Sequence, residues 1–152
     1  MQVFSSADEI LDFAISKEDL AIQFYRDLAT RIDRPHMQQI FEEFATEEVV
    51  HKEKLLLVKT NKLLLPIEDK ILDLRVDRYV TDASYSQDTD YQNVLLMAME
   101  REKVAFNLYT DLAAITEDES LSGIFTALAQ EEAKHKLRIE HEYEKYSPNT
   151  PE

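Results

Sequence analysis

The feature that most constrains the fold of this chain is an internal repeat. Residues 11–52 align with residues 95–136 at a constant offset of 84 positions without a gap, and 15 of the 42 aligned positions are identical. Each copy ends in the pattern Glu-Glu-x-x-His-Lys, as EEVVHK at 47–52 and as EEAKHK at 131–136. We therefore expect two copies of one structural unit, packed so that each buries the apolar face of the other.

Each copy carries the pattern of two amphipathic helices. In the first copy, apolar residues recur every three or four positions along residues 11–28 and again along residues 40–58, with a break at Asp33-Arg34-Pro35 between them. Ser6 followed by Glu9 predicts a capping box at the start. The second copy repeats this pattern from about residue 90 to residue 146, with a turn near 116–119. Only one Gly and four Pro occur in the chain, which favours long helices over a sheet.

The repeat predicts an all-α fold with a single domain over residues 1–152. Short turns inside each copy give antiparallel helix pairs, so we expect a four-helix bundle built from a duplicated helical hairpin. The repeats span about 6–60 and about 90–146. Residues 66–90 would form a long crossover between the second and third helices, because this connection must travel the length of the bundle. Within it, ILDLRVDRYV is compatible with a short helix or an extended turn.

Composition excludes several classes of function. The formal net charge of −14 argues against binding to nucleic acid or to an anionic membrane surface and favours cations or basic partners. No apolar run approaches the ~18 residues of a membrane span, and MQVFSSADEI lacks the features of a signal peptide, so we expect a soluble, cytoplasmic protein. Because the chain has no Cys, redox chemistry would depend on nitrogen and oxygen ligands.

Charged residues interrupt the apolar faces of all four predicted helices. At 100° per residue, each Glu-x-x-His places one carboxylate and one imidazole inside the apolar stripe, with the preceding glutamate at its edge. The first helix of each copy adds a glutamate flanked by inward alanines. The inward set is Glu18, Glu48, His51, Glu102, Glu132 and His135, and the edge positions are Glu47 and Glu131.

Four inward carboxylates without a basic partner would repel one another and lose their hydration. Two divalent cations would balance their charge, and the two imidazoles would supply nitrogen ligands. A lone Glu-x-x-His is usually a solvated helix face, but two copies in repeat register favour a two-metal site. Mixed carboxylate and imidazole ligands favour iron or manganese, with zinc as a further possibility. For Tyr25 and Tyr109 both core packing and a hydrogen bond to a ligand carboxylate are compatible with the sequence.

The chain resembles the rubrerythrin branch of the ferritin-like di-iron superfamily over nearly its whole length. The resemblance rests on AISKEDLAIQFYRDLA at 14–29 and AMEREKVAFNLYTDLA at 98–113, each followed by F-x-x-F/L-A-x-E-E-x-x-H. It implies a carboxylate-bridged di-iron centre, with Glu48 and Glu132 as bridges and with Tyr25 and Tyr109 hydrogen-bonded to ligands. The implied iron ligands are the six inward residues, Glu18, Glu48, His51, Glu102, Glu132 and His135.

The resemblance implies an oxidoreductase, with peroxide reduction by electrons from a separate donor protein as the first expectation. The alternatives are a ferroxidase that oxidises Fe(II) with oxygen or otherwise handles iron, and a metal-binding bundle without catalysis. Two departures bear on this choice: the chain has no Cys-rich rubredoxin domain, and Ala105 stands where rubrerythrins carry an extra glutamate. The family also implies a homodimer. Leu63, Leu64, Leu65 and Ile67 are compatible with a dimer interface or with a cover over the end of the bundle.

Overall fold

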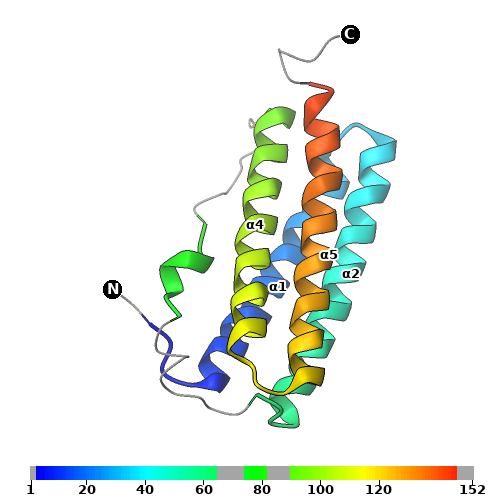
Figure 1. The fold of residues 1–152 in the computed structure, drawn as a ribbon. Helices are drawn as coiled ribbons and strands as arrows, with labels where there is room; N and C mark the ends of the chain where they lie inside the picture. Colours follow the sequence, from blue (N-terminus) through cyan, green and yellow to red (C-terminus); the bar gives the residue numbers. More distant parts are fainter. Residues whose placement is uncertain (1–2, 65–73, 82–89, 147–152) are drawn as a thin grey trace.

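The protein is an antiparallel four-helix bundle, described here by a computed structural model for residues 3–64, 74–81 and 90–146. The long helices are α1 (Ala7–Arg31), α2 (Pro35–Thr60), α4 (Tyr91–Ile115) and α5 (Glu119–Glu144), and a short 3-10 helix, η1, spans Val76–Tyr79. Figure 1 shows the four helices side by side, with η1 next to α4. The all-α fold and the bundle predicted from the repeat are confirmed.

Side-chain caps fix the starts of three of the long helices. The backbone N–H of Glu9 donates to the Ser6 hydroxyl at 3.0 Å, and Asp90 and Asp118 accept from the N–H three residues later at 2.9 and 2.8 Å. Pro35 is the first residue of α2. Proline has no backbone N–H, and at this position an N–H would have no acceptor within the helix. The predicted capping box is only half formed, because the Glu9 carboxylate accepts from Ser5 and not from the backbone N–H of Ser6.

The two repeats form two helical hairpins. Helix α1 packs along α2 and helix α4 packs along α5, with only short connections at residues 32–34 and 116–118. Helix α1 also contacts α4, which brings the first helices of the two repeats together. The hairpins are therefore arranged about a pseudo-twofold axis, and residues 84 positions apart occupy equivalent places.

Two apolar clusters fill the bundle, one toward each end. One contains Leu11, Leu55 and Phe125, and the other contains Phe41 and Leu95, all of them fully buried. The six inward charged residues predicted from the sequence lie on the helix segments between the two clusters. A polar layer thus crosses an otherwise apolar interior, which is costly unless its groups are paired or bind a ligand.

The described part of the crossover is tied to the bundle by polar contacts. Arg75 forms an isolated β-bridge with Val3, and the Tyr79 hydroxyl donates to Asp111 of α4 at 2.6 Å. Of the two alternatives for ILDLRVDRYV, a short helix or an extended turn, the described residues near its end form a short helix, η1. Much of the predicted crossover lies outside the described residues, as do Leu65 and Ile67. Leu64 is buried, whereas Leu63 is about half exposed.

Among the residues that the structure describes, no helix is both long enough and apolar enough to cross a bilayer.

Candidate metal centre

All six inward residues are buried at the centre of the bundle. None of the six residues exposes more than 3% of its surface. The one other charged residue that is buried in the described part of the chain is Glu142, which accepts a hydrogen bond from Tyr91 and pairs with Lys145. The ion-pair contacts that the structure describes for the six central residues are instead with one another and with Glu47 and Glu131. The set is Glu18, Glu48, His51, Glu102, Glu132 and His135.

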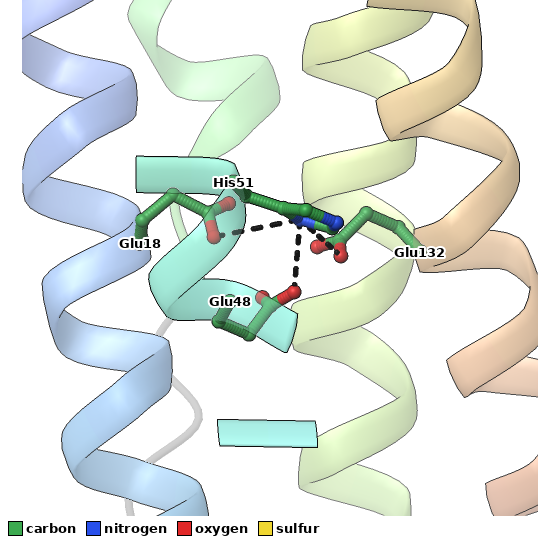
Figure 2. Close-up of side chains that lie close together, drawn as sticks. All are labelled: Glu18, Glu48, His51 and Glu132. Carbon is green, nitrogen blue, oxygen red and sulfur yellow. Dashed lines mark ion pairs between the residues drawn. The ribbon is translucent and has the colours of Figure 1, made fainter. Parts of the chain in front are cut away.

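The first half of the site surrounds His51. Its Nδ1 atom lies 3.0 Å from Glu48 Oε1, 3.2 Å from Glu132 Oε1 and 3.7 Å from Glu18 Oε2. Figure 2 shows the three carboxylates converging on this nitrogen from α1, α2 and α5. The donor atoms of these four residues lie within 4.8 Å of one another, which is close enough for one metal ion to contact all of them.

The second half of the site repeats this geometry around His135. Its Nδ1 atom lies 3.6 Å from Glu102 Oε1, 3.7 Å from Glu132 Oε1 and 3.8 Å from Glu48 Oε1. These four donor atoms also lie within 4.8 Å of one another. Glu48 and Glu132 belong to both halves, whereas Glu18 and Glu102 each belong to one. The two halves therefore share two carboxylates, which is the arrangement that two bridged cations require.

The hydrogen-bonding state of these groups fits a pair of cations. Each of the six residues has at least one buried oxygen or nitrogen atom without a hydrogen-bond partner, and both oxygens of Glu48 lack one. Buried polar atoms are nearly always hydrogen-bonded in folded proteins, so a cluster of six residues with unpaired buried atoms needs an explanation. Lone pairs on carboxylate oxygens and imidazole nitrogens are the donors that iron and manganese prefer. The donor set therefore suits a di-metal centre.

The same crowding of buried carboxylates makes the site electrostatically unfavourable when no metal is bound. Burial and the charge of Glu48 raise the pKa of Glu18 well above its usual range. Burial and the charges of Glu102 and Glu48 do the same for Glu132. Burial also acts on Glu48, but its contacts with His51 and Glu132 outweigh this effect and lower its pKa. Without metal, the site must take up protons to relieve the repulsion among its carboxylates.

Each of the two tyrosines singled out in the sequence donates a hydrogen bond across the pseudo-twofold axis. The Tyr109 hydroxyl of α4 donates to Glu18 Oε1 of α1 at 2.6 Å, and the Tyr25 hydroxyl of α1 donates to Glu102 Oε1 of α4. Both phenols are buried. Burial and the neighbouring carboxylates raise the pKa of each, so both remain protonated donors. Each bond leaves the second oxygen of its carboxylate available to a metal.

The glutamates at the edge of the stripe have a role that sequence analysis missed. Glu131 accepts a hydrogen bond from His51 Nε2, and Glu47 accepts one from His135 Nε2. Each contact joins the two repeats, because the glutamate and the histidine lie on different hairpins. These contacts fix each ring so that Nδ1 faces the carboxylates, where its lone pair could bind a metal once the ring has lost the Nδ1 proton. The signal in the sequence was the first glutamate of Glu-Glu-x-x-His, which is duplicated along with the second.

A cavity of about 30 Å³ adjoins the site on the side of α1 and α4. Its buried lining includes all four central carboxylates and Tyr109. A cavity needs roughly 10–15 Å³ to hold one water molecule, so this space accommodates a molecule of two or three heavy atoms. A molecule of this size therefore fits beside the carboxylates without a rearrangement of the helices.

Comparisons with known proteins agree with this geometry. A sequence model of the family described as Rubrerythrin matches residues 9–72 and 93–151. A search of curated protein sequences finds no match. A crystal structure from Thermotoga maritima, described as a ferritin-like di-iron-carboxylate protein, superposes with a TM-score of 0.77 at 18% identity and covers 97% of this chain and 100% of its own. A hypothetical protein from Pyrococcus furiosus gives a TM-score of 0.73 at 22% identity and covers 90% of this chain and 87% of its own. At these identities the structural likeness establishes the fold.

Proposed function

Because the chain belongs to the rubrerythrin family, we propose that it is a di-iron oxidoreductase that reduces hydrogen peroxide with electrons from a separate donor protein. The observation that carries the proposal is the pair of overlapping donor groups, which share Glu48 and Glu132 and consist of buried atoms without hydrogen-bond partners. An oxidoreductase of this kind needs two metal ions close enough to act on one small substrate, and shared carboxylates keep them so.

The six central residues would hold the two ions. Glu18 and His51 would bind one ion and Glu102 and His135 the other, while Glu48 and Glu132 would bridge them. Two dications would neutralise four carboxylates, which removes the repulsion that adds to burial in raising the pKa of Glu18 and Glu132. Two ferrous ions bound here would supply the two electrons that reduction of one peroxide to water requires.

The residues that hydrogen-bond to the ligands would hold them in place while the charge of the metal ions changes. Tyr25 and Tyr109 hold the carboxylates of Glu102 and Glu18 by hydrogen bonds, so these side chains do not need to reorient when charge changes. Glu47 and Glu131 hold the imidazoles in the tautomer that leaves Nδ1 available. Such outer contacts typically change metal affinity by about 10–100-fold when removed.

The two apolar clusters would protect the centre from bulk water on the sides toward the ends of the bundle. One cluster lies toward each end, and the polar layer lies between them. The cavity beside α1 and α4 then provides a small opening to the carboxylates. A site of this size favours hydrogen peroxide or oxygen over larger oxidants. The proposal assigns the supply of electrons to a separate donor protein, since residues 1–152 contain no Cys that could hold an iron–sulfur or rubredoxin-type site.

Peroxide reduction and ferroxidase activity can be separated in a single turnover. The protein is loaded anaerobically with Fe(II), freed of excess metal, and mixed with either hydrogen peroxide or oxygen while iron oxidation is followed by absorbance. Much faster oxidation by peroxide, with iron retained, supports the proposal. Faster oxidation by oxygen with release of ferric iron would support a ferroxidase. Retention of metal without either reaction would identify a binding protein, and selective retention of manganese or zinc would replace iron as the proposed metal.

A further inference from the structure

The two halves of the metal site differ in one aromatic contact. The Phe44 ring of α2 stacks on the imidazole of His135, with the ring centres 4.0 Å apart and the ring planes at 23° to each other. The equivalent residue in the second repeat, 84 positions later, is Leu128, which is also buried. In the described part of the chain, the one ring contact of His51 is with His135, at 6.4 Å between centres. One imidazole therefore has a phenyl ring against its face, and the other does not.

Phe44 belongs to a group of aromatic rings that also supports the second ligand of the same half. Its ring packs edge-on against Tyr25 at 5.4 Å and against Phe41 at 6.1 Å between centres. Tyr25 in turn donates its hydrogen bond to Glu102. The two ligands that belong only to this half, Glu102 and His135, are thus each held by a member of one aromatic group.

The other groups that hold the ligands are the same in both repeats. The ligands themselves, the tyrosines that donate to them and the glutamates that accept from the imidazoles are identical residue types 84 positions apart. The alanines one helical turn after Glu18 and Glu102 are identical as well. The difference between Phe44 and Leu128 is therefore the one that can make the two halves of the site unequal.

A stacked phenyl ring favours a metal ion on the imidazole in two ways. It holds the imidazole in one orientation before the ion arrives, so less conformational freedom is lost on binding. It also places the negative face of its quadrupole against an imidazole that gains positive character when a dication binds. We propose that Phe44 is a positioning residue that makes the two metal positions unequal, so that the first ion binds at Glu102 and His135 and the second at Glu18 and His51. This inference rests on the proposed function, because it uses the two ligand sets assigned there.

The order of filling is followed by NMR of the imidazole groups during titration with Zn(II), a diamagnetic substitute for Fe(II). In the wild type, the His135 signals should shift with the first equivalent of metal and the His51 signals with the second. Phe44→Leu introduces the residue type that the other repeat carries, so both sets of signals should then shift together. In calorimetry with Mn(II), the same variant should raise the Kd for the first ion by about threefold to tenfold, the effect of losing one stacked pair.

Phe44→Tyr and Phe125→Leu are the matched controls. Phe44→Tyr keeps a ring against His135 and should keep the wild-type order. Phe125→Leu makes the same change of side chain in the other apolar cluster, and it should also keep the order, because the described ring contacts of the two histidines do not include Phe125.

Three results would overturn this inference and leave the two-metal site intact. They are a wild type in which both positions fill together or His51 fills first, an unchanged order in Phe44→Leu, and an equal loss of order in Phe125→Leu. The wild-type measurement alone tests the order, whether or not each variant folds. Failure of the wild type to bind two ions would overturn the proposed function as well.

Discussion

The hydroxyl of Tyr109 on α4 donates a hydrogen bond to Glu18 on α1, across the pseudo-twofold axis of the bundle, at 2.6 Å. The contact lies between equivalent helices of the two repeats. Tyr25 on α1 donates the equivalent hydrogen bond to Glu102 on α4. Each repeat thus holds a predicted metal ligand of the other. The site requires both hairpins, which explains why a duplication that retains the ligands also retains the tyrosines.

Replacement of Tyr109 by Phe should weaken metal binding while keeping the ring packed. The hydrogen bond lowers the pKa of Glu18 against the opposing effect of burial, so its loss would make the carboxylate harder to ionise. We expect the Kd for Fe(II) or Mn(II) to rise by about tenfold or more, since metals bind the ionised form. The measurement is metal titration by calorimetry at pH 7.

Tyr91→Phe provides the control for this experiment. Tyr91 lies on the same helix and donates a similar 2.6 Å hydrogen bond to Glu142, away from the predicted ligands. Its replacement should leave the metal affinity unchanged. Equal affinities in the Tyr109 and Tyr91 variants would show that the Tyr109 hydroxyl does not support a ligand.

Glu47→Ala should weaken binding through His135. Glu47 accepts the Nε2 proton, and without this acceptor the imidazole is free to change tautomer or orientation. We expect a loss of about 10–100-fold in metal affinity, as measured by competition with a chelator. Glu43→Ala, one turn earlier on α2 and also exposed, should have little effect. A comparable loss in both variants would attribute the effect to surface charge.

Glu132→Gln should have opposite effects on the protein with and without metal. In the absence of metal, Glu132 is a buried carboxylate next to Glu102 and Glu48, so a neutral amide of similar shape removes repulsion. We expect the free energy of unfolding in EDTA to rise by about 1–2 kcal/mol. The same variant should lose metal, because it removes a predicted bridge. Urea unfolding with and without Mn(II) measures both effects, and destabilisation in EDTA would contradict this account.

The stability of the metal-free protein should fall as pH rises. Burial and neighbouring carboxylates raise the pKa of Glu18 and Glu132 above the usual 4.5. Burial lowers the pKa of His135, but the hydrogen bond and charge of Glu102 outweigh it and raise the value from 6.5 to about 9. Between its unfolded and folded pKa, each group holds more protons in the folded state, so stability is lost as pH increases through that interval.

Urea midpoints in EDTA should therefore decrease from pH 5.5 to pH 9. Added Mn(II) should reverse the trend over the same range, because the metal binds deprotonated ligands and stabilises the folded state more at higher pH. A metal-free protein whose midpoint rises between pH 5.5 and 9 would contradict the assignment of the buried carboxylates.

Much of the fold and the central residues could be predicted, because the repeat and the helical period carry the necessary information. Glu18 and Glu48 lie on apolar faces in the sequence, and the structure buries both. The role of Glu131 was missed, because its partner His51 lies on the other hairpin and helical phase within one segment does not reveal it. Tyr79 lines the cavity from the crossover, which has no counterpart in the repeat and no periodic pattern.

The most direct test of the account is the metal content and Mössbauer spectrum of protein loaded anaerobically with ⁵⁷Fe(II) and then oxidised. The overlapping donor groups predict about two irons per chain, coupled magnetically through Glu48 and Glu132. Glu48→Ala should lose the coupling. One uncoupled iron per chain, or no retained iron, would contradict the claim that the duplicated Glu-x-x-His motifs build a di-iron centre.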